Sequence, residues 1–287
     1  MTTFHVGLLV ETRYRSQLQP AGLVLALRAA GHAVTMIDPQ HEATRLTGGD
    51  AAIDAFDVVV ARGRSWEVLC LLSLAESRGI PTVNRHASVA AVHNKAQMAV
   101  ALASAGIDTP ATFLGGASAV AQACAAANAY PIVVKPIFGD NGCGLSIAHT
   151  PDELATLDLP QPWLAQAFVP YCCEVKVYGI GEDVWTLRRP ARFATKVAQP
   201  STAPPSAAPQ PADSRYRELG SRCQDVFGLD AYGIDCIETP DGPVVIEVNE
   251  FPNYSGIADA SQRLAHLVAR GASAGHPVRR TSCVSRF

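Results

Sequence analysis

The sequence predicts a protein of mixed α/β and α+β class, with a small α/β domain on a parallel sheet followed by a larger α+β part. In the first third, short runs rich in Val, Leu and Ile alternate with helical patterns, which indicates a parallel sheet covered on both faces. The rest of the chain carries apolar runs joined by short turn sequences, which is typical of antiparallel strands. A length of 287 residues suits roughly two domains.

The first domain, residues 1–86, is expected to have the element order β-α-β-β-α-β. The expected strands are 4–10, 33–38, 57–63 and 80–84, and the expected helices are 23–31 and 68–79. No GxGxxG motif follows the first strand, so a dinucleotide site is not expected there.

The second part begins with an expected helix over 87–105 that carries Lys95 in its middle. Further strands are expected at 111–114, 130–136, 144–150, 163–169, 174–180 and 183–189, with helices at 117–129 and 213–228 and a hairpin over 233–249. We divide this part into domains at 87–165 and 166–270. Residues 199–211 hold five prolines among small residues and predict a mobile loop, and 271–287 predict a disordered tail.

Composition favours small molecules as partners. The net charge is -3 and only 17% of the residues are charged, so we expect neither nucleic acid nor a membrane surface as a partner. The first residues lack a signal-peptide pattern, and the most apolar helical run, 68–75, is far shorter than the roughly 20 residues that span a bilayer. Eight cysteines without CxxC spacing indicate reduced thiols in a cytoplasmic protein and no zinc site.

The stretch IVVKPIFGDNGCGLSI, residues 132–147, combines a strand that ends in Lys135 with a loop holding Gly139, Gly142 and Gly144. Such a loop can turn its backbone N–H groups toward phosphate. It is not a Walker A motif, and a plain hairpin with an edge lysine is the alternative. The chain has only four lysines among 23 basic residues, which suggests a specific need for an ammonium group at each.

The stretch 233–257 carries a second candidate site. Glu247 and Asn249 are two apart on an apolar strand and share one face. A three-residue loop at 240–242 would pair Thr239 with Pro243 and place Asp235 opposite Glu247. Two carboxylates and an amide converging on rigid strands suit Mg²⁺. The alternative is a solvated hairpin face with ordinary polar alternation.

Together these stretches resemble the ATP-grasp superfamily, and most closely the RimK-like group of glutamate ligases. The resemblance covers about 87–270 and rests on motifs that occur in the family's order. They read NK (94–95), VKPIFGDNGCG (134–144), QAFV (166–169), EVK (174–176), LRR (187–189) and EVNEFP (247–252). The α/β domain at the start matches the domain that precedes ATP-grasp in this superfamily.

The resemblance implies a role for each matching residue. The nucleotide would be bound by Lys95, Lys135, Gly139, Asn141, Gly142, Gly144, Gln166, Ala167, Phe168, Val169 and Glu174, with Gln166–Val169 at the adenine. Mg²⁺, or Mn²⁺ in its place, would be held by Asp235, Glu247 and Asn249. Lys176 and Arg189, or Arg188 instead of Arg189, would be catalytic and neutralise the transferred phosphoryl group.

The implied reaction is phosphorylation of a small-molecule or cofactor carboxylate by ATP, followed by attack of an amine, in first place glutamate or another amino acid, to form an amide. Two departures affect the substrates. Residues 199–211 replace a DFR-x-N-type segment of the glutamate ligases, and Lys176 stands where the family has arginine. The stretches 176–189 and 248–257 also resemble inositol-trisphosphate kinases, so a kinase of a phosphorylated polyol is the alternative, and a nucleotide-binding protein without turnover is a third reading. The resemblance further suggests a homo-oligomer.

Overall fold

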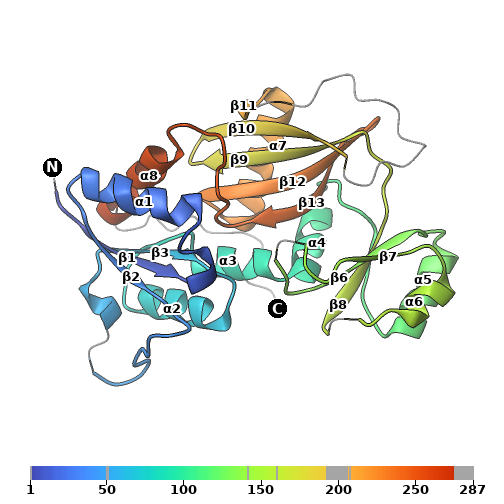
Figure 1. The fold of residues 1–287 in the computed structure, drawn as a ribbon, viewed down its shortest axis with the longest axis horizontal. Helices are drawn as coiled ribbons and strands as arrows, with labels where there is room; N and C mark the ends of the chain where they lie inside the picture. Colours follow the sequence, from blue (N-terminus) through green and yellow to red (C-terminus); the bar gives the residue numbers. More distant parts are fainter. Residues whose placement is uncertain are drawn as a thin grey trace.

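The structure is a computed structural model that describes residues 2–49, 52–140, 142–159, 161–191, 206 and 208–274. Its strands form three sheets, one parallel and two antiparallel (Figure 1). The mixed α/β and α+β class is confirmed, with the parallel sheet in the N-terminal part.

The N-terminal sheet has the strand order β2-β1-β3-β4, with all neighbours parallel. Its elements are β1 (His5–Val10), α1 (Leu18–Ala29), β2 (Ala33–Ile37), β3 (Val58–Arg62), α2 (Trp66–Ser77) and β4 (Thr82–Val83), with short 3-10 turns at Thr12–Tyr14 and Ala52–Ala55. Alternate residues of β1 enter two different cores, because Leu8 packs with α1 whereas Leu9 packs with α2. The two helices therefore cover opposite faces of the sheet.

The C-terminal helix α8 (Ala260–Ala274) also packs on this sheet, beside α1 (Figure 1). Its buried Leu264 and Val268 share one core with Leu8 and Leu23. The helix continues to Ala274, so the expected disorder from residue 271 is wrong for 271–274. Residues 275–287 of that expected tail lie outside the described residues.

A break at Asn94 divides the helix that we expected over 87–105 into α3 (His86–His93) and α4 (Lys95–Ser104). The backbone of Asn94 is extended, with φ -94° and ψ 99°, and its side-chain oxygen accepts hydrogen bonds from the amides of Ala96 and Gln97, each at 3.1 Å. Asn94 is thus the N-cap of α4. Lys95 begins the second helix and does not lie in the middle of one helix.

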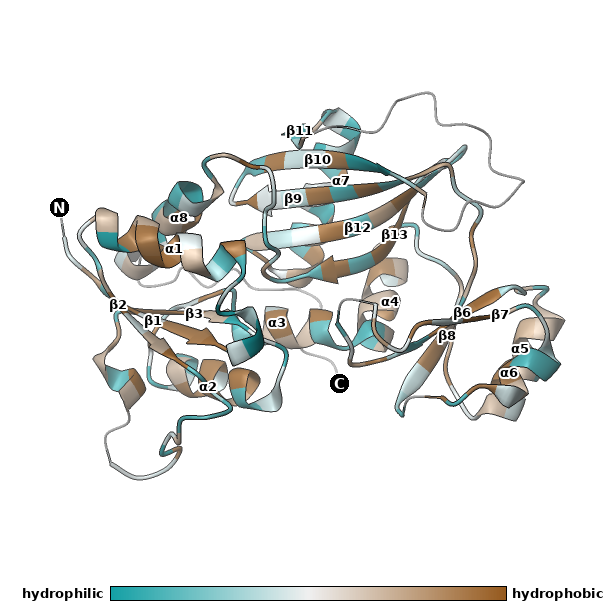
Figure 2. Ribbon diagram, viewed as in Figure 1, coloured by the Kyte–Doolittle hydropathy of each residue, from teal (hydrophilic) through white to brown (hydrophobic). Residues whose placement is uncertain are grey.

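The middle sheet has the order β5-β8-β6-β7 and is antiparallel. Its elements are β5 (Thr112–Phe113), α5 (Ala117–Ala126), β6 (Ile132–Pro136), β7 (Ser146–Ala148), α6 (Pro151–Thr156) and β8 (Trp163–Ala167). The helices α5 and α6 pack on one face through Val120, Cys124 and Leu154. Figure 2 shows apolar residues along β6 and β8, the two central strands.

The third sheet is antiparallel with the order β11-β10-β9-β12-β13. Its elements are β9 (Cys173–Ile180), β10 (Asp183–Pro190), β11 (Gln210–Pro211), α7 (Ser214–Phe227), β12 (Ala231–Thr239) and β13 (Gly242–Asn249). One face packs on α7, α3 and α4. On the opposite face, Tyr178, Ile180 and Leu187 pack in the core of the N-terminal sheet, and other residues of that face line a cavity.

The short strand β11 lies in the stretch 199–211 that we expected to be a mobile loop, so that expectation is wrong for Gln210 and Pro211. Residues 199–205 and 207 lie outside the described residues. In the described part of the chain, no helix combines the length and the apolar character needed to cross a membrane, and seven cysteines are free thiols.

Candidate active site

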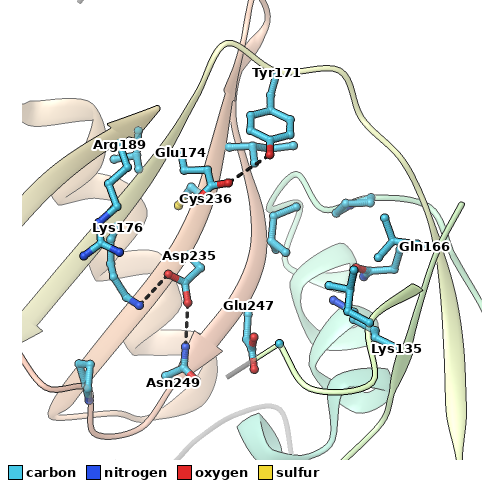
Figure 3. A pocket seen from close by; sticks show the side chains of 18 of the residues that line it. Lys135, Gln166, Tyr171, Glu174, Lys176, Arg189, Asp235, Cys236, Glu247 and Asn249 are labelled. Carbon is cyan, nitrogen blue, oxygen red and sulfur yellow. Dashed lines mark hydrogen bonds and ion pairs between the residues drawn. The ribbon is translucent and has the colours of Figure 1, made fainter. Parts of the chain in front are cut away.

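A cavity of about 460 Å³ lies between the middle and the third sheet (Figure 3). Most of the residues that the sequence singled out line it, namely Lys135, Gly142, Gln166, Ala167, Phe168, Val169, Glu174, Lys176, Arg189, Asp235, Glu247 and Asn249. These residues come from β6, β8, β9, β10, β12 and β13 and the segments that follow them. The topology therefore gathers side chains that are more than a hundred positions apart in the sequence.

Asp235 lies opposite Glu247 in the register of β12 and β13, as the sequence predicted. The expected pairing of Thr239 with Pro243 is wrong, since Thr239 pairs with Gly242 around a two-residue turn. A β-bulge between Asp235 and Cys236 shifts the register by one residue and restores the pair. The bulge leaves Ile246 as an extra residue, and its side chain lines the cavity beside Glu247.

Lys176 continues the same row, because it lies opposite Asp235 on the neighbouring strand β9. Its Nζ is 3.0 Å from Asp235 Oδ1, and Asn249 Nδ2 donates to Asp235 Oδ2 at 3.1 Å (Figure 3). Burial lowers the pKa of Lys176, but the carboxylate of Asp235 more than offsets this effect and raises it. Lys176 is thus a fixed cation directly beside the acidic pair.

Asp235, Glu247 and Asn249 fit a divalent metal ion. Their two carboxylates and one amide carbonyl are hard oxygen ligands of the kind that Mg²⁺ takes. The excess negative charge is now balanced by Lys176 at Asp235 and by Lys95, whose Nζ is 3.1 Å from Glu247 Oε1. Arg64 lies 3.7 Å from Glu247 as well, so three cations are held against these two carboxylates.

Lys135 is the residue before the last of strand β6 and points into the cavity with 7% of its surface exposed. Burial lowers its pKa to about 8, Glu247 opposes the shift, and Lys95 adds to it. No ion pair of Lys135 with another described residue is found. A buried ammonium without a carboxylate partner favours an anionic ligand.

The glycine loop follows Lys135 and is anchored at its start. The carbonyl oxygen of Gly139 accepts hydrogen bonds from Lys95 Nζ at 2.7 Å and from Arg64 Nη1 at 3.2 Å. Gly142 and Gly144 have φ of 71° and 73°, where a side chain would be strained. Lys95, Gly139 and Gly144 are not in the cavity lining, and Asn141 lies outside the described residues.

Gln166–Val169 cross from β8 into the segment toward β9 and line the other end of the cavity. Gln166 Nε2 donates to Thr112 Oγ1 at 3.0 Å, and the amides of Ala167 and Phe168 donate to Ala111 and Pro131. Tyr171 donates to Glu174 Oε1 at 3.1 Å. These contacts fix a short wall of mainly apolar character.

The two candidate arginines of β10 point to opposite faces. Arg189 lies opposite Glu174 and lines the cavity, whereas Arg188 forms an ion pair with Glu238 on the other face. The hydrogen bond that Arg188 donates to the carboxylate of Glu238 raises the pKa of Arg188. Of the two, Arg189 is the one that faces the acidic residues of the site.

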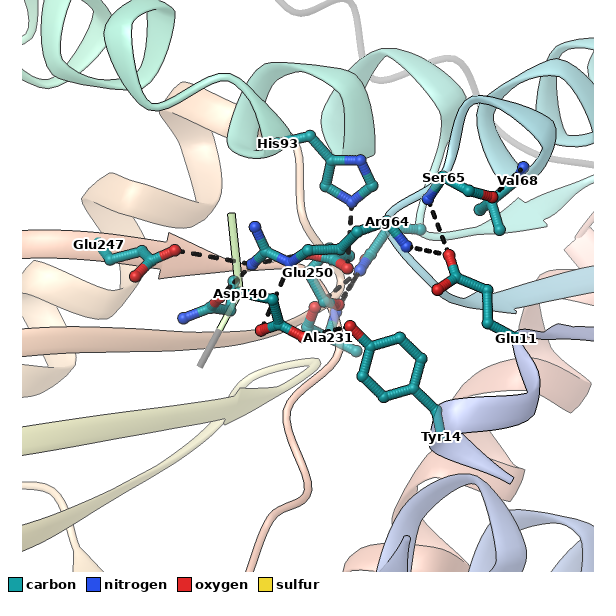
Figure 4. Close-up of polar contacts among 12 residues, drawn as sticks. Glu11, Tyr14, Arg64, Ser65, Val68, His93, Asp140, Ala231, Glu247 and Glu250 are labelled. Carbon is teal, nitrogen blue, oxygen red and sulfur yellow. Dashed lines mark hydrogen bonds and ion pairs between the residues drawn. The ribbon is translucent and has the colours of Figure 1, made fainter. Parts of the chain in front are cut away.

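Sequence reasoning missed a second group of polar residues around Arg64, shown in Figure 4. Arg64 Nη2 donates to Asn249 Oδ1 at 2.5 Å and lies 3.7 Å from Glu247 and 3.8 Å from Glu250. The backbone amides of Arg64 and Ser65 donate to Glu11 Oε1. Arg64 thus joins the N-terminal sheet to Glu247 of β13 and to Glu250 just after it.

The carboxylate of Glu250 is buried and lies 3.2 Å from His93 Nε2. Burial raises its pKa, but His93 and Arg64 lower it by more, so the carboxyl is held well below its ordinary range. Tyr14 adds a second link to the glycine loop, because its hydroxyl donates to Asp140. Glu11, Tyr14 and Arg64 all lie within four residues after the end of β1 or β3. Ligand sites lie at such carboxyl ends of parallel strands, so this signal was present in the sequence.

Known proteins resemble the chain in both parts. Residues 92–268 match the RimK-like ATP-grasp domain, and residues 11–92 match the LysX preATP-grasp domain. A protein of Thioalkalivibrio sulfidiphilus named "Probable alpha-L-glutamate ligase" is 28% identical over 261 residues, which are 83% of this chain and 85% of that protein.

Two solved structures share the fold. A RimK domain ATP-grasp protein from Sphaerobacter thermophilus gives a TM-score of 0.71 at 24% identity, and covers 92% of this chain and 99% of its own. A D-cycloserine synthetase gives a TM-score of 0.68 at 17% identity, with 93% and 99% covered.

Proposed function

Because this chain belongs to the RimK-like ATP-grasp family, it is an ATP-dependent ligase that forms C–N bonds, and we propose that it adds an amino acid, in first place glutamate, to the carboxylate of a small molecule or cofactor. The observation that carries the proposal is the row Lys176, Asp235 and Glu247 across three strands, in one cavity with Lys135. This row offers both a metal site and cations for a transferred phosphoryl group.

The proposed reaction has two steps. An oxygen of the substrate carboxylate attacks the γ-phosphorus of ATP, the bond to the bridging oxygen breaks, and ADP leaves. The amine nitrogen then attacks the acyl carbon, phosphate leaves, and the amine gives up a proton. In both steps negative charge shifts to the leaving group. The protein therefore accelerates them mainly by holding positive groups at fixed positions near that charge.

We assign the nucleotide to the part of the cavity between β6, β8 and β9. Lys135 would contact the phosphates, Gln166–Val169 the adenine, and Glu174 the sugar hydroxyls. Gly139, Asn141, Gly142 and Gly144 would let the loop cover the phosphates, with Lys95 at its root. The pocket lining and the buried charge of Lys135, which has no ion-pair partner among the described residues, support this assignment.

Asp235, Glu247 and Asn249 would hold Mg²⁺, with Mn²⁺ as an alternative. ATP-grasp ligases use ATP with a divalent metal, which supplies charge neutralisation at the phosphates when bound. Lys95 and Lys176 now neutralise these carboxylates, and we expect their ammonium groups to turn to the phosphate oxygens once the metal is in place. Arg189 would face the transferred phosphoryl group from β10.

The substrates remain proposals. Glutamate is favoured because the relative reported above carries the name of a glutamate ligase. None of the three proteins reported above is named a kinase, so they give no support to the alternative of a polyol kinase. We also retain as proposals a homo-oligomer and the division at 1–86, 87–165 and 166–270.

Mass spectrometry tests the proposal. The purified protein is incubated with Mg-ATP, a small-metabolite extract and the twenty common amino acids, beside a Lys135→Ala control. We expect a metabolite that gains one amino-acid residue, with ADP and phosphate released together, and no such product from the control. A metabolite that gains a phosphoryl group without an amino acid would contradict the proposal.

A further inference from the structure

Besides Lys135, the same cavity is lined by a second buried cation, which has no role in the reaction proposed above. Arg62, the last residue of β3, lines the cavity and is 8% exposed. Its Nη2 donates to the neutral side chain of Gln17 at 3.1 Å, its guanidinium lies 4.1 Å from the centre of the Tyr14 ring, and its Nε has no hydrogen-bond partner. Among the described residues it forms no ion pair.

Arg64, two residues further on, has the opposite character. It lies near Asp140, Glu247 and Glu250 and donates to Asn249 and Gly139. Arg64 thus forms ion pairs with carboxylates. Arg62 lies near enough to the buried carboxylate of Glu250 to help lower its pKa, but no carboxylate of the described residues is within ion-pair distance of Arg62. A buried guanidinium binds a carboxylate strongly, because the bond is charge-assisted and can be bidentate.

Asn253 supplies the complementary group. Its Oδ1 is buried without a hydrogen-bond partner in the described part of the protein, and the residue lines the same cavity. The flanking residues Phe251 and Tyr254 pack in one cluster with Tyr14, on which Arg62 stacks. Arg62 is also close enough to Tyr254, the residue after Asn253, to lower its pKa, so the two candidate residues approach one part of the cavity lining. An unsatisfied acceptor such as Asn253 Oδ1 costs free energy unless a donor fills it.

We propose that Arg62 and Asn253 hold the amino acid that supplies the amine, Arg62 by its α-carboxylate and Asn253 Oδ1 by its amino group. This inference rests on the proposed ligase function. A free anion-binding group and a free hydrogen-bond acceptor match the two ends of an α-amino acid. They lie on the N-terminal sheet and after β13, apart from β8, where we place the adenine.

Binding measurements on the full chain test the proposal without turnover. The protein is loaded with Mg²⁺ and a non-hydrolysable ATP analogue, and each of the twenty common amino acids is titrated by calorimetry. The amino acid that binds most tightly is then compared with its α-amide and with its deaminated analogue. Wild-type protein should bind both analogues more weakly, on the order of tenfold for a lost hydrogen bond to a charged group.

Each of the two variants should remove the preference for the amino acid over only one of the two analogues. Arg62→Gln should bind the amino acid and its α-amide equally, and Asn253→Ala should bind the amino acid and its deaminated analogue equally. Arg62→Lys should keep part of the first preference. Arg45→Gln, at an exposed arginine outside the cavity, should behave as wild type.

Unchanged preferences in Arg62→Gln and Asn253→Ala would overturn the inference and leave Arg62 as a structural partner of Tyr14. It would also be overturned if the analogue-loaded protein bound no amino acid. Failure of the wild-type protein to bind the ATP analogue would instead contradict the proposed function, so the two failures are distinguishable. Thermal unfolding of every variant confirms that the fold is kept.

Discussion

At Lys135, burial and charge act against each other. The side chain has only 7% of its surface exposed, and its pKa is lowered to about 8 because the ammonium loses water. A nucleotide phosphate would restore the favourable environment for the charge. Lys135 is therefore a residue whose protonation should be coupled to nucleotide binding.

This coupling predicts a pH dependence of nucleotide affinity. Below pH 8 the free protein already carries the proton on Lys135, so affinity is constant. Above pH 8 binding must take up a proton, and affinity falls by up to about tenfold per pH unit. Titration with a Mg-ATP analogue at pH 7, 8 and 9 measures this. Lys135→Arg keeps its charge throughout and should remove the slope, and an equal fall in that variant would contradict the assignment.

A second prediction concerns Glu250, whose folded pKa lies below the value of about 4.3 for an unfolded chain. Its ionised form therefore stabilises the fold above that pH, and the contribution is lost as the pH falls toward the folded pKa. Glu250→Gln should cost about 3 kcal/mol at pH 7, because Arg64 and His93 lose a buried anionic partner.

Urea unfolding at pH 7 and pH 3 measures the difference between Glu250→Gln and wild type. We expect the difference to shrink at the lower pH. The control is Glu182→Gln, at an exposed carboxylate, which should change stability by less than about 0.5 kcal/mol. A loss in Glu250→Gln that is equal at both pH values would show that the ionised form has no special role.

Residue spacing predicted the side chains that lie on regular strands, and it could not predict those that meet across domains. The shared face of Glu247 and Asn249 follows from strand alternation, whereas the pairing of Asp235 with Glu247 was predicted from a three-residue loop and is in fact produced by a two-residue turn together with a β-bulge. The contacts of Tyr14 with Asp140 and of Arg64 with Asn249 join residues more than a hundred positions apart. The periodicity of apolar residues gives no information about contacts between distant segments. Only the rule that ligand sites lie at the carboxyl ends of parallel strands pointed to these residues.

On the scale of elements, the β-bulge in β13 determines which side chains of this strand line the cavity. Because Ile246 is left without a partner between Glu247, which pairs with Asp235, and Val245, which pairs with Cys236, an apolar and an acidic side chain line the cavity from adjacent positions. A regular strand would turn one of them to the other face. The sequence of the hairpin does not reveal the bulge, since the expected three-residue loop gives the same pairing at Asp235.

The bulge predicts separate effects at its two residues. Ile246→Ala should weaken nucleotide binding about tenfold through lost apolar contact and leave the response to Mg²⁺ unchanged. Glu247→Gln should instead abolish the Mg²⁺-dependent gain in affinity. Titrations of ADP with and without Mg²⁺ measure both. An unchanged Mg²⁺ response in Glu247→Gln would contradict the metal assignment.

Other element boundaries differ from expectation for local reasons. Asn94 interrupts a helix because its side chain caps the following turn, and apolar periodicity continues through the break. Helix α6 was not expected, although Thr150 caps it, Pro151 begins it and Glu153 lies in its first turn. That pattern is a recognisable helix start. A helix of six residues is too short to show the apolar periodicity that would support its prediction from the sequence.

At the scale of the whole molecule, the C-terminal helix completes the N-terminal sheet. Leu264, Ala265 and Val268 of α8 are buried in the core that includes Leu8 of β1. Gln19 Nε2 also donates to Ser261 Oγ at 2.6 Å. The proposed first domain, 1–86, therefore depends on residues near the other end of the described chain.

A truncation tests this dependence. Ending the chain at Asp259 should abolish cooperative unfolding, because each buried side chain of α8 contributes about 1.5–3 kcal/mol against a total stability of about 5–15 kcal/mol. The control ends after Ala274 and should unfold as the full chain does. Circular dichroism during heating compares them. A cooperative transition at an unchanged temperature in the shorter chain would show that α8 is dispensable.

The position of α8 also has a consequence for synthesis on the ribosome. The parallel sheet is translated first, yet one of its faces stays partly uncovered until residues 260–274 have left the exit tunnel (Figure 1). At roughly 5–20 residues per second, this delay lasts many seconds. A nascent chain with an open apolar face is a natural client for chaperones, and pairing of its first and last elements is a slow, late event in folding.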